Sequence, residues 1–559
     1  MDRPWYAHYD EGVPREVDYP EVPLYELMRR TAQANPDRQA IDFMGKRMSY
    51  GQLWLQTRRF ARALQDLGVE RGDRVAIMLP NSPQFVIAFY GTLLAGAVAV
   101  NTNPLYTPRE LSHQLRDSDA ETLVILDLLW PRYAEVAGEV PVKRVITTGL
   151  QDYLPFPKNW LFPLKAKKEG RWVQLPDDPK RHDWRKLQNT PPEPREHPLQ
   201  ADDLALLQYT GGTTGAAKGA MLSHRNLISN VYQVDAWEPG QVWKHGVMLS
   251  VIPFFHVYGM TVSMNYSVMR GMKMVLLPRF EIAEVVSAIE KHRVTHFPGV
   301  PTMYVAFNTF PGIENRNIRT IKVCLSGAAP LPVEVATKFE ELTGAKLVEG
   351  YGLTEAAPVT HCNPLYGERK VGSIGLPFPS VDAYCADPEG RPLPPGEAGE
   401  LVVKGPNVML GYWNRPEETA QTLKDGWLFT GDVARMDEEG FFYIVDRKKD
   451  MIIAGGYNIY PREVEEVIYQ HPAVKEAAVV GVPDAYRGET VKAFVVLKEG
   501  YAGEVGEDEL RAFAKERLAA YKVPKLWEFR DDLPKTAVGK ILRRMLRKEE
   551  EEKKGERPS

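Results

Sequence analysis

Residues 209–219, with the sequence YTGGTTGAAKG, bring together the residue types that bind phosphate: four glycines, three threonines and Lys218. Glycine lets backbone N–H groups approach an anion closely. Threonine hydroxyls reach phosphate oxygens or phosphate-bound Mg²⁺, and lysine adds positive charge. A flexible Gly/Thr linker has a similar composition, but linkers seldom stand between a buried apolar run such as 204–207 and a helix start, for which Ser223 is the predicted N-cap. The stretch therefore predicts a phosphate-binding loop.

This loop does not have the Walker A pattern, which needs a glycine, four residues and then Gly-Lys followed by Ser or Thr. Counting from Gly211 or Gly212 places an alanine where the second glycine belongs. Gly219, not a hydroxyl residue, follows Lys218. The loop is therefore expected to bind phosphate by a different arrangement.

Two other stretches place small residues at the ends of predicted strands. Residues 349–355, EGYGLTE, follow a predicted strand at 345–348. Tyr351 between two glycines suits stacking on a planar base such as adenine, and Glu355 suits a hard cation such as Mg²⁺. Residues 326–330, SGAAP, also end a strand, and α/β sheets bind ligands at such carboxyl ends. A tight turn with a surface glutamate remains the alternative for 349–355.

Three further stretches each carry one candidate functional side chain. His256 lies among aromatics in PFFHVYG at 253–259, although a lone histidine there is more often a satisfied core residue. Asp432 follows a Thr-Gly pair, read as a turn, in WLFTGD, and a ribose diol is a natural partner for its carboxylate. Lys540 ends the loop PKTAVGK at 534–540 and is unremarkable on its own.

The whole chain has the composition of a soluble globular enzyme. Its 559 residues predict two to four domains. A net charge of −4 gives no whole-chain reason to expect nucleic acid. The three cysteines show neither metal-ligand spacing nor a disulfide framework, which fits a reducing cytosol. The N-terminus lacks a signal-peptide core, and the longest apolar run, 85–100, is short for a membrane span. We expect a cytoplasmic protein.

Strands and helices alternate over most of the chain and predict an α/β fold with parallel-rich sheets. The predicted large N-terminal domain covers 1–446, with a small β subdomain at about 367–446 where short strands and Gly/Pro turns prevail. A small α+β domain follows at 447–559, and its charged tail from about 548 is expected to be disordered. Residues 1–25 are read as an arm lying on a neighbour or on the body of the protein.

Residues 151–198 interrupt this alternation. Apolar aromatics beside clustered lysines, WLFPLKAKK at 160–168, suggest peripheral contact with an anionic membrane through 159–171. A solvated surface excursion is the alternative, and the sequence favours it.

The order and spacing of 209–219, 349–355, 429–432, 446–450 and 534–540 resemble those of the adenylate-forming superfamily, which includes acyl- and aryl-CoA synthetases, luciferases and the adenylation domains of peptide synthetases. The resemblance extends from about residue 24 to 544. Within the superfamily the chain is most similar to bacterial long-chain fatty-acid–CoA ligases, notably in 209–222 and in DRKKDMII at 446–453.

The resemblance implies roles for individual residues. Lys540 would reach the substrate carboxylate and the α-phosphate, and Glu355 with Thr210 would bind Mg²⁺. Tyr351 would stack on adenine, Asp432 and Arg447 would contact ribose, and Lys449 would lie at a hinge on which the small C-terminal domain moves. The implied ATP and AMP site comprises Thr210, Gly211, Gly212, Thr213, Thr214, Gly215, Lys218, Gly327, Ala328, Ala329, Glu349, Gly350, Tyr351, Gly352, Thr354, Asp432, Arg447 and Lys449. The implied acyl and CoA pocket comprises His256, Tyr258, Gly327, Gly352, Gly455 and Gly456.

The implied reaction joins a long-chain fatty acid to coenzyme A through an acyl-adenylate, with ATP and Mg²⁺, and releases AMP and pyrophosphate. The alternatives are a medium-chain or aryl acid–CoA ligase, an acyl-AMP ligase, a phosphotransferase and a lipid-binding protein. Two departures from the family pattern stand out: Ile453 replaces a residue that is often lysine, and Thr-Gly-Gly replaces the commoner Thr-Ser-Gly. Many relatives are homodimers, so a homodimer is also considered.

Overall fold

The computed structural model describes residues 2–170, 172–210, 217–239, 246–447, 450–454, 457–484, 487–501, 503–536, 539 and 541–555. Cα packing divides the chain into two compact units, which we treat separately. The first unit comprises 3–382 with 404–428, and the second comprises 383–403 with 429–559. These units are defined by packing and do not test the predicted domain boundary at residue 446, which remains a prediction.

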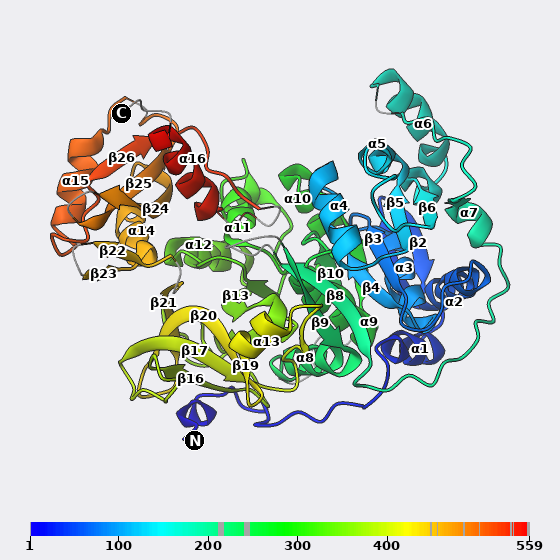
Figure 1. Cartoon of the computed structure of the whole chain (residues 1–559), viewed down its shortest axis with the longest axis horizontal. Coiled ribbons are helices and arrows are strands. Elements are labelled where there is room, and N and C mark those ends of the chain that lie inside the picture. The colour runs from blue at the N-terminus through cyan, green and yellow to red at the C-terminus, as the bar shows by residue number, and fades with distance from the viewer. Residues whose placement is uncertain are drawn as a thin grey trace. The chain divides into compact units, whose positions relative to one another are not determined.

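An eight-stranded sheet is the largest element of the first unit (Figure 1). Its order is β18-β9-β8-β4-β3-β5-β6-β7. The strands from β8 to β7 pair in parallel, whereas β9 and β18 are added antiparallel at one edge. Their bounds are β3 Arg74–Met78, β4 Val98–Asn101, β5 Thr122–Leu126, β6 Arg144–Thr148, β7 Arg181–Asp183, β8 Leu204–Thr210, β9 Lys218–Ser223 and β18 Gly411–Tyr412. The predicted parallel-rich α/β fold is confirmed.

Two four-stranded sheets contribute further strands that position the site in the first unit. One has the order β10-β11-β1-β2, and the other has the order β12-β13-β14-β15. Single bridges through His296 connect β10 to β12. The bounds are β1 Gln39–Phe43, β2 Lys46–Ser49, β10 Val247–Ser250, β11 Lys273–Leu276, β12 Val323–Ser326, β13 Lys346–Gly352, β14 Val359–Cys362 and β15 Leu376–Pro377. The short strand β19, Leu423–Lys424, belongs to neither sheet and pairs antiparallel with residues 427–428. An aromatic core with Phe297, Phe307 and Phe339 packs beneath them.

Some helices of the first unit begin at side-chain caps that the sequence supplies. Ser223 accepts a hydrogen bond from the Asn226 N–H and caps α8, as predicted. Thr107 and Glu110 form a reciprocal capping box at the start of α4. The helices are α1 Tyr25–Ala34, α2 Tyr50–Asp66, α3 Pro83–Leu94, α4 Pro108–Asp117, α5 Trp130–Ala134, α6 Lys158–Lys168, α7 Trp184–Leu187, α8 His224–Ala236, α9 Tyr266–Arg270, α10 Ile282–His292, α11 Pro301–Asn308, α12 Val333–Thr343 and α13 Pro416–Thr422.

The apolar run 85–100 is a buried helix leading to a buried strand, as the sequence predicts: α3 is buried over nearly its whole length, and β4 follows it. In the described part of the chain, no helix combines the length and the apolar character needed to cross a membrane. The run therefore belongs to the protein core.

The N-terminal arm lies on its own unit. Trp5 is fully buried, and the Arg3 guanidinium pairs with Asp382 at 2.6 Å. The Asp10 carboxylate accepts the backbone N–H groups of 365–367. Of the two predicted positions for the arm, on a neighbour or on the body of the protein, the structure shows the second.

The second unit contains two sheets. The first includes β16 Asp382–Ala386, β17 Ala398–Lys404, β20 Trp427–Met436 and β21 Phe442–Arg447. The second has the order β23-β22-β25-β24, with β26 parallel to β25. Its strands are β22 Ile452–Ala454, β23 Tyr457–Ile459, β24 Val474–Asp484, β25 Gly488–Leu497 and β26 Leu526–Phe529, with helices α14 Pro461–Tyr469, α15 Glu507–Lys515 and α16 Arg543–Gly555.

The C-terminal tail differs from the prediction. Helix α16 extends to Gly555, so residues 548–555 are helical instead of disordered. Ion pairs with the adjacent sheet supply the reason: Glu550 lies 2.7 Å from the Lys492 ammonium, and Glu549 lies 2.6 Å from the Arg530 guanidinium. Residues 556–559 lie outside the described part of the chain.

Candidate active site

The predicted phosphate loop connects the two strands of an antiparallel hairpin. Thr210 at the end of β8 pairs directly with Lys218 at the start of β9. The sequence interpretation placed a helix start after the loop, but β9 comes first and α8 follows it. Gly211, Gly212, Thr213, Thr214 and Gly215 lie outside the described residues. The described ends fix where the loop leaves and re-enters the sheet.

Side chains from α4 hold both stems of this hairpin. The Tyr209 hydroxyl donates to Asp117 Oδ2 at 2.8 Å, and the Arg415 guanidinium donates to Asp117 Oδ1 at 2.6 Å. Burial, helped by the Asp117 charge, raises the pKa of Tyr209. The His113 ring nitrogen Nε2 lies 3.0 Å from the Ala217 carbonyl oxygen. The hairpin ends are therefore anchored to a helix as well as to each other.

Glu355, the predicted Mg²⁺ ligand, lies in the short 3₁₀ helix η6 (Thr354–Ala356). The Tyr412 hydroxyl donates to Glu355 Oε1 at 2.7 Å, and the Met409 N–H donates to the Glu355 carbonyl at 2.8 Å. A carboxylate oriented by a second hydrogen-bonding side chain is a typical ligand for a hard cation. The donor set of Glu355 and the Thr210 hydroxyl fits Mg²⁺.

Tyr412 connects this carboxylate to the phosphate loop. The Lys218 ammonium lies 5.3 Å from the centroid of the Tyr412 ring and 3.6 Å from Glu418 Oε1. Tyr412 pairs with Ala220 through β18 and β9, which places its side chain beside the hairpin. Burial and the negative charge of Glu355 raise the pKa of Tyr412, so the phenol stays protonated and donates. The sequence interpretation missed this residue; its one signal was the Gly-Tyr-Trp triplet at 411–413.

Two neighbouring parallel strands present the predicted nucleotide wall. Ser326 on β12 pairs with Glu349 on β13, so Gly327, Ala328 and Ala329 lie beside Glu349 and Gly350. Ala328 has φ +68°, a conformation that a non-glycine residue rarely adopts and that often marks a ligand site. The half-buried Tyr351 ring meets the His361 ring at 5.9 Å in an edge arrangement. Strand β13 runs through Gly352, so the cluster 349–352 is a strand end and not a loop.

Gly352 is required by packing in this structure. A Cβ added there would lie 2.1 Å from the Pro358 carbonyl oxygen, which no real Cβ tolerates. At Gly327 an added Cβ would meet the Tyr258 ring at 3.3 Å, a tight approach. The backbone at these two glycines therefore packs directly against its neighbours.

Two of the predicted acyl-pocket residues, His256 and Tyr258, lie just before a π-helix, η4 (Gly259–Asn265), whose seven residues are all buried. Such π-turns are frequent at functional sites. The Tyr258 hydroxyl donates to the Leu325 carbonyl at 2.6 Å, which ties this segment to β12. Burial lowers the pKa of His256 to about 4, and its Nε2 finds no hydrogen-bond partner among the described residues. His256 is therefore neutral at pH 7 and ill suited to act as a base.

In the second unit, Asp432 on β20 lies directly opposite Arg447 on β21. The predicted ribose-contacting pair is thus brought together by strand register. The predicted Thr-Gly turn is part of the continuous strand β20, in which Gly431 adopts φ +72°. Lys449, Gly455, Gly456, Lys540 and the side chain of Arg447 lie outside what the structure describes.

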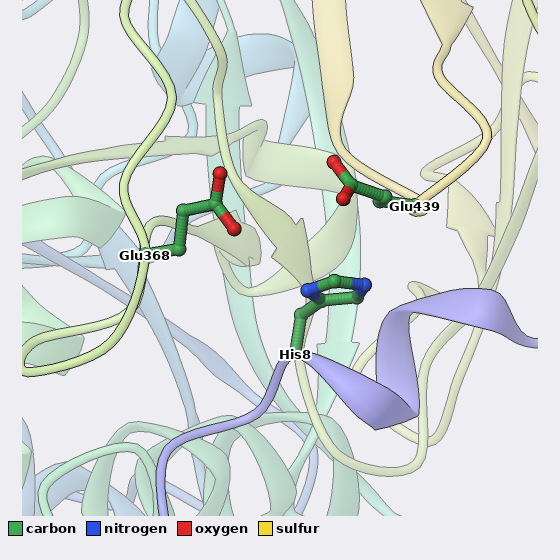
Figure 2. Close-up of side chains that lie close together, drawn as sticks. All are labelled: His8, Glu368 and Glu439. Carbon is green, nitrogen blue, oxygen red and sulfur yellow. The ribbon is translucent and has the colours of Figure 1, made fainter.

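Figure 2 draws three other side chains of metal-ligating type. His8 and the exposed Glu368 belong to the first unit, whereas the exposed Glu439 belongs to the second. Two side chains on the first unit are too few to hold an ion. We assign no metal site to them.

Comparison with known proteins gives full-length matches. The AMP-binding enzyme family matches residues 28–413, and the AMP-binding enzyme C-terminal domain matches 463–540. The chain is 51% identical over 561 residues to a long-chain-fatty-acid–CoA ligase of Bacillus subtilis, covering 98% of each chain. It is 42% identical to the ligase of that name from Escherichia coli O6:H1, again over 98% of each. ATP-bound MatB from Rhodopseudomonas palustris superposes with a TM-score of 0.82 at 32% identity, covering 94% of this chain and 99% of MatB.

Proposed function

The chain belongs to the AMP-binding enzyme family, and from this premise we propose how its residues divide the chemistry. It is an AMP-forming long-chain fatty-acid–CoA ligase. Its substrates are a fatty acid, ATP and coenzyme A, and its metal is Mg²⁺. The first step makes an acyl-adenylate and releases pyrophosphate, and the second transfers the acyl group to the CoA thiol and releases AMP.

The chemistry explains why these residue types are needed. A carboxylate cannot expel oxide, so it must first become a mixed anhydride with AMP. Attack of one anion on another builds negative charge, which nearby cations must stabilise. We assign Lys218 and the loop backbone to the β- and γ-phosphates, Glu355 with Thr210 to the metal, and Lys540 to the α-phosphate and the carboxylate. Bound Mg²⁺ would supply charge neutralisation on the phosphate oxygens.

The observation that carries this assignment is the Tyr412 side chain, which contacts Glu355 through its hydroxyl and Lys218 through its ring face. The carboxylate assigned to the metal and the ammonium assigned to the phosphates thereby meet at one residue. A hairpin of purely structural function has no need of an acid and a base held at its mouth. The arrangement favours a metal-assisted pyrophosphate-releasing site.

The nucleotide wall and the acyl pocket complete the proposed site. We assign Tyr351, Gly327–Ala329 and Glu349–Gly352 to the nucleotide, and Asp432 with Arg447 to the ribose. His256 and Tyr258 are assigned to the acyl pocket, where a neutral histidine acts as a gate and not as a base. For the second step, the pair Gly455 and Gly456 suits a narrow passage for pantetheine.

The test is AMP release measured with CoA across saturated acids of graded length and a set of aryl acids. A long-chain ligase releases AMP fastest with long acyl chains. A preference for medium-chain or aryl acids would move the assignment to those ligases, and AMP-acyl product without CoA consumption would indicate an acyl-AMP ligase. Release of ADP in place of AMP would indicate a phosphotransferase and refute the proposal.

We also propose that the protein is cytoplasmic and touches membranes through 159–171, by way of helix α6. This helix lies at the periphery of the first unit, beyond α5 (Figure 1). Trp160, Leu161 and Leu164 are 69%, 47% and 54% exposed, whereas Phe162 is partly buried and Ala166 is buried. The four lysines of α6, at positions 158, 165, 167 and 168, are all exposed. Exposed apolar side chains among lysines match an anionic bilayer, in which the fatty-acid substrate also dissolves.

Vesicle sedimentation tests this contact. A Trp160→Ser/Leu164→Ser variant should lose most of its binding to anionic phosphatidylglycerol vesicles, and Lys165→Gln/Lys168→Gln should lose about tenfold. Val371→Ser, which changes a residue 71% exposed elsewhere on the unit, is the matched control. Unchanged sedimentation of both α6 variants would show that α6 is a solvated excursion.

A homodimer is the remaining proposal, and it rests on the resemblance alone. The 63.2 kDa chain should then elute at twice its mass in light-scattering chromatography. A monomer mass at micromolar concentration would dispose of it.

A further inference from the structure

Arg543, the first residue of α16, is surrounded by three carboxylates in the second unit. Its guanidinium binds Glu465 through two nitrogens, at 2.9 Å from Nε to Oε1 and 2.5 Å from Nη2 to Oε2. Its Nη1 lies 3.5 Å from Asp446 Oδ1 and 3.3 Å from Asp450 Oδ2. The side chain is 19% exposed, and that of Asp446 only 1%. Two-nitrogen pairing of this kind fixes the direction of the side chain as well as its charge.

Two of the three carboxylates, those of Asp446 and Glu465, also accept backbone hydrogen bonds. The Arg462 N–H donates to Asp446 Oδ2 at 2.7 Å, and the Val479 N–H donates to Glu465 Oε1 at 2.7 Å. Backbone groups therefore hold Asp446 and Glu465, and these two acids together with Asp450 define the position that Arg543 takes.

The positions of two of these acids along the chain are informative. Asp446 belongs to β21, whereas Asp450 lies just before β22. They stand on either side of 447–449, the segment in which the proposed hinge residue Lys449 lies. Arg543 therefore contacts both flanks of the proposed hinge with one guanidinium, and Glu465 adds a third attachment on α14.

Arg543 also ends the loop that carries Lys540. The Leu542 N–H donates to the Pro534 carbonyl at 2.8 Å, and Lys535 bridges to Ile541, so the loop closes at its base. At the incoming end, Leu533 is buried and the Lys535 ammonium pairs with Glu476 at 2.8 Å. At the outgoing end, Arg543 follows Lys540 by three residues and supplies the ionic anchor.

We propose that Arg543 is a positioning residue for the adenylation step: it fixes the outgoing end of the Lys540 loop and links that loop to both flanks of the hinge. The inference rests on the proposed role of Lys540. Arg543 does not touch the reacting groups in this account. It sets the position of residues 541–543, the outgoing end of the loop, relative to Asp446 and Asp450.

The test separates the two half-reactions in the full-length enzyme. ATP–pyrophosphate exchange measures adenylation, and CoA-dependent consumption of preformed acyl-AMP measures transfer. Arg543→Lys keeps the charge but loses the two-nitrogen geometry, so exchange should fall by about tenfold or more while transfer stays within about twofold. Arg547→Lys, one turn further along α16 and paired with Asp450 at 3.5 Å, is the matched control and should change neither.

A second variant covers the case in which Arg543→Lys does not fold. Glu465→Gln keeps an oxygen for the Val479 N–H but removes the charge that binds Arg543, and should give the same split between the half-reactions. An equal fall in both half-reactions, or unchanged exchange in a folded variant, would overturn the inference. Lys540→Ala run in parallel distinguishes the two failures: if it retains exchange, the role of Lys540 fails; if it loses exchange while Arg543→Lys does not, only the role of Arg543 fails.

Discussion

The phosphate side of the first unit and the hinge side of the second are held by different forces. At the phosphate side, strand register sets Thr210 against Lys218, and a protonated phenol orients Glu355. At the hinge side, one guanidinium holds three carboxylates that come from separate elements. The first arrangement depends on strand pairing, whereas the second depends on ion pairs between side chains.

The difference follows from what each region has to do. A site that binds a leaving group must keep its donors in place throughout turnover, and a continuous hydrogen-bonded sheet does this best. The region that we propose to act as a hinge would need links that can be broken and remade. Ion pairs between side chains provide such links without breaking the backbone hydrogen bonds of either partner.

The largest expected effect is on adenylation, the step for which the second unit is proposed to supply Lys540. Lys540→Ala should lower ATP–pyrophosphate exchange by roughly two orders of magnitude or more, because the α-phosphate loses its cation. Transfer from preformed acyl-AMP should continue. Lys548→Ala removes the same charge from a side chain that is 75% exposed and serves as the control. Normal exchange in Lys540→Ala would sink the assignment.

Glu355→Gln tests the phosphate side and comes next in size. Loss of the carboxylate charge should raise the Mg²⁺ concentration needed for half-maximal exchange by about tenfold or more, since Mg²⁺ prefers charged oxygen ligands. The measurement is a Mg²⁺ titration of ATP–pyrophosphate exchange. Glu341→Gln, an exposed residue of α12, is the control. An unaltered metal dependence would contradict the role given to Glu355.

Tyr412→Phe separates orientation from charge at the same site. The variant keeps the ring beside Lys218 but removes the hydroxyl that donates to Glu355 at 2.7 Å. Loss of an orienting partner typically weakens metal binding by about tenfold. A Mg²⁺ titration should therefore move in the same direction as for Glu355→Gln but less far. A larger shift than for Glu355→Gln would mean that Tyr412 itself is the ligand.

The last prediction concerns acid stability and not catalysis, and it distinguishes the two units. Burial lowers the pKa of His224 and His256 to about 4 and that of His361 to about 3, all in the first unit. The unfolded chain binds protons at these rings below about pH 6.5, so their contribution to stability is lost as pH falls from there toward 4. In the second unit, the lysine and arginine partners of Glu528 outweigh its desolvation and lower its pKa to about 2, so its contribution is lost only below about pH 4.5.

Urea unfolding followed between pH 7 and pH 4 measures this difference. Tryptophan signals from the first unit should weaken first, by on the order of several kcal/mol for three histidines. His361→Gln should flatten the pH dependence. If the second unit unfolds first on acidification, the assignment of acid sensitivity to these histidines is wrong.

Motif order predicted more of this molecule than local pattern did. Local chemistry predicted the cap at Ser223 and the buried run 85–100, and the structure confirms both. The predicted α/β fold class is also confirmed. Strand β9, which follows the phosphate loop, was missed because Lys218–Ser223 carries no strong strand signal of its own. It forms a strand by pairing with its neighbours in the sheet. Tyr412 was missed for the same reason, since β18 has two residues.

The C-terminal tail shows the opposite error. Its charged composition predicts disorder when read alone, but its glutamates and lysines have partners on β25 and β26 some 20 to 60 residues away. Composition describes what a segment can bury by itself. It does not show which complementary charges the fold will bring to it.

Tyr412 has one more consequence, for how this site can change over generations. Because the same ring contacts Lys218 and orients Glu355, a substitution that alters either neighbour alters the surroundings of the other. If Lys218 binds the phosphates and Glu355 the metal, as we propose, substitutions at the two residues will be epistatic: their effects on phosphate binding and on metal preference will not add in a double variant. A substitution that changes one of these properties during evolution will also change the other unless a second substitution compensates for it.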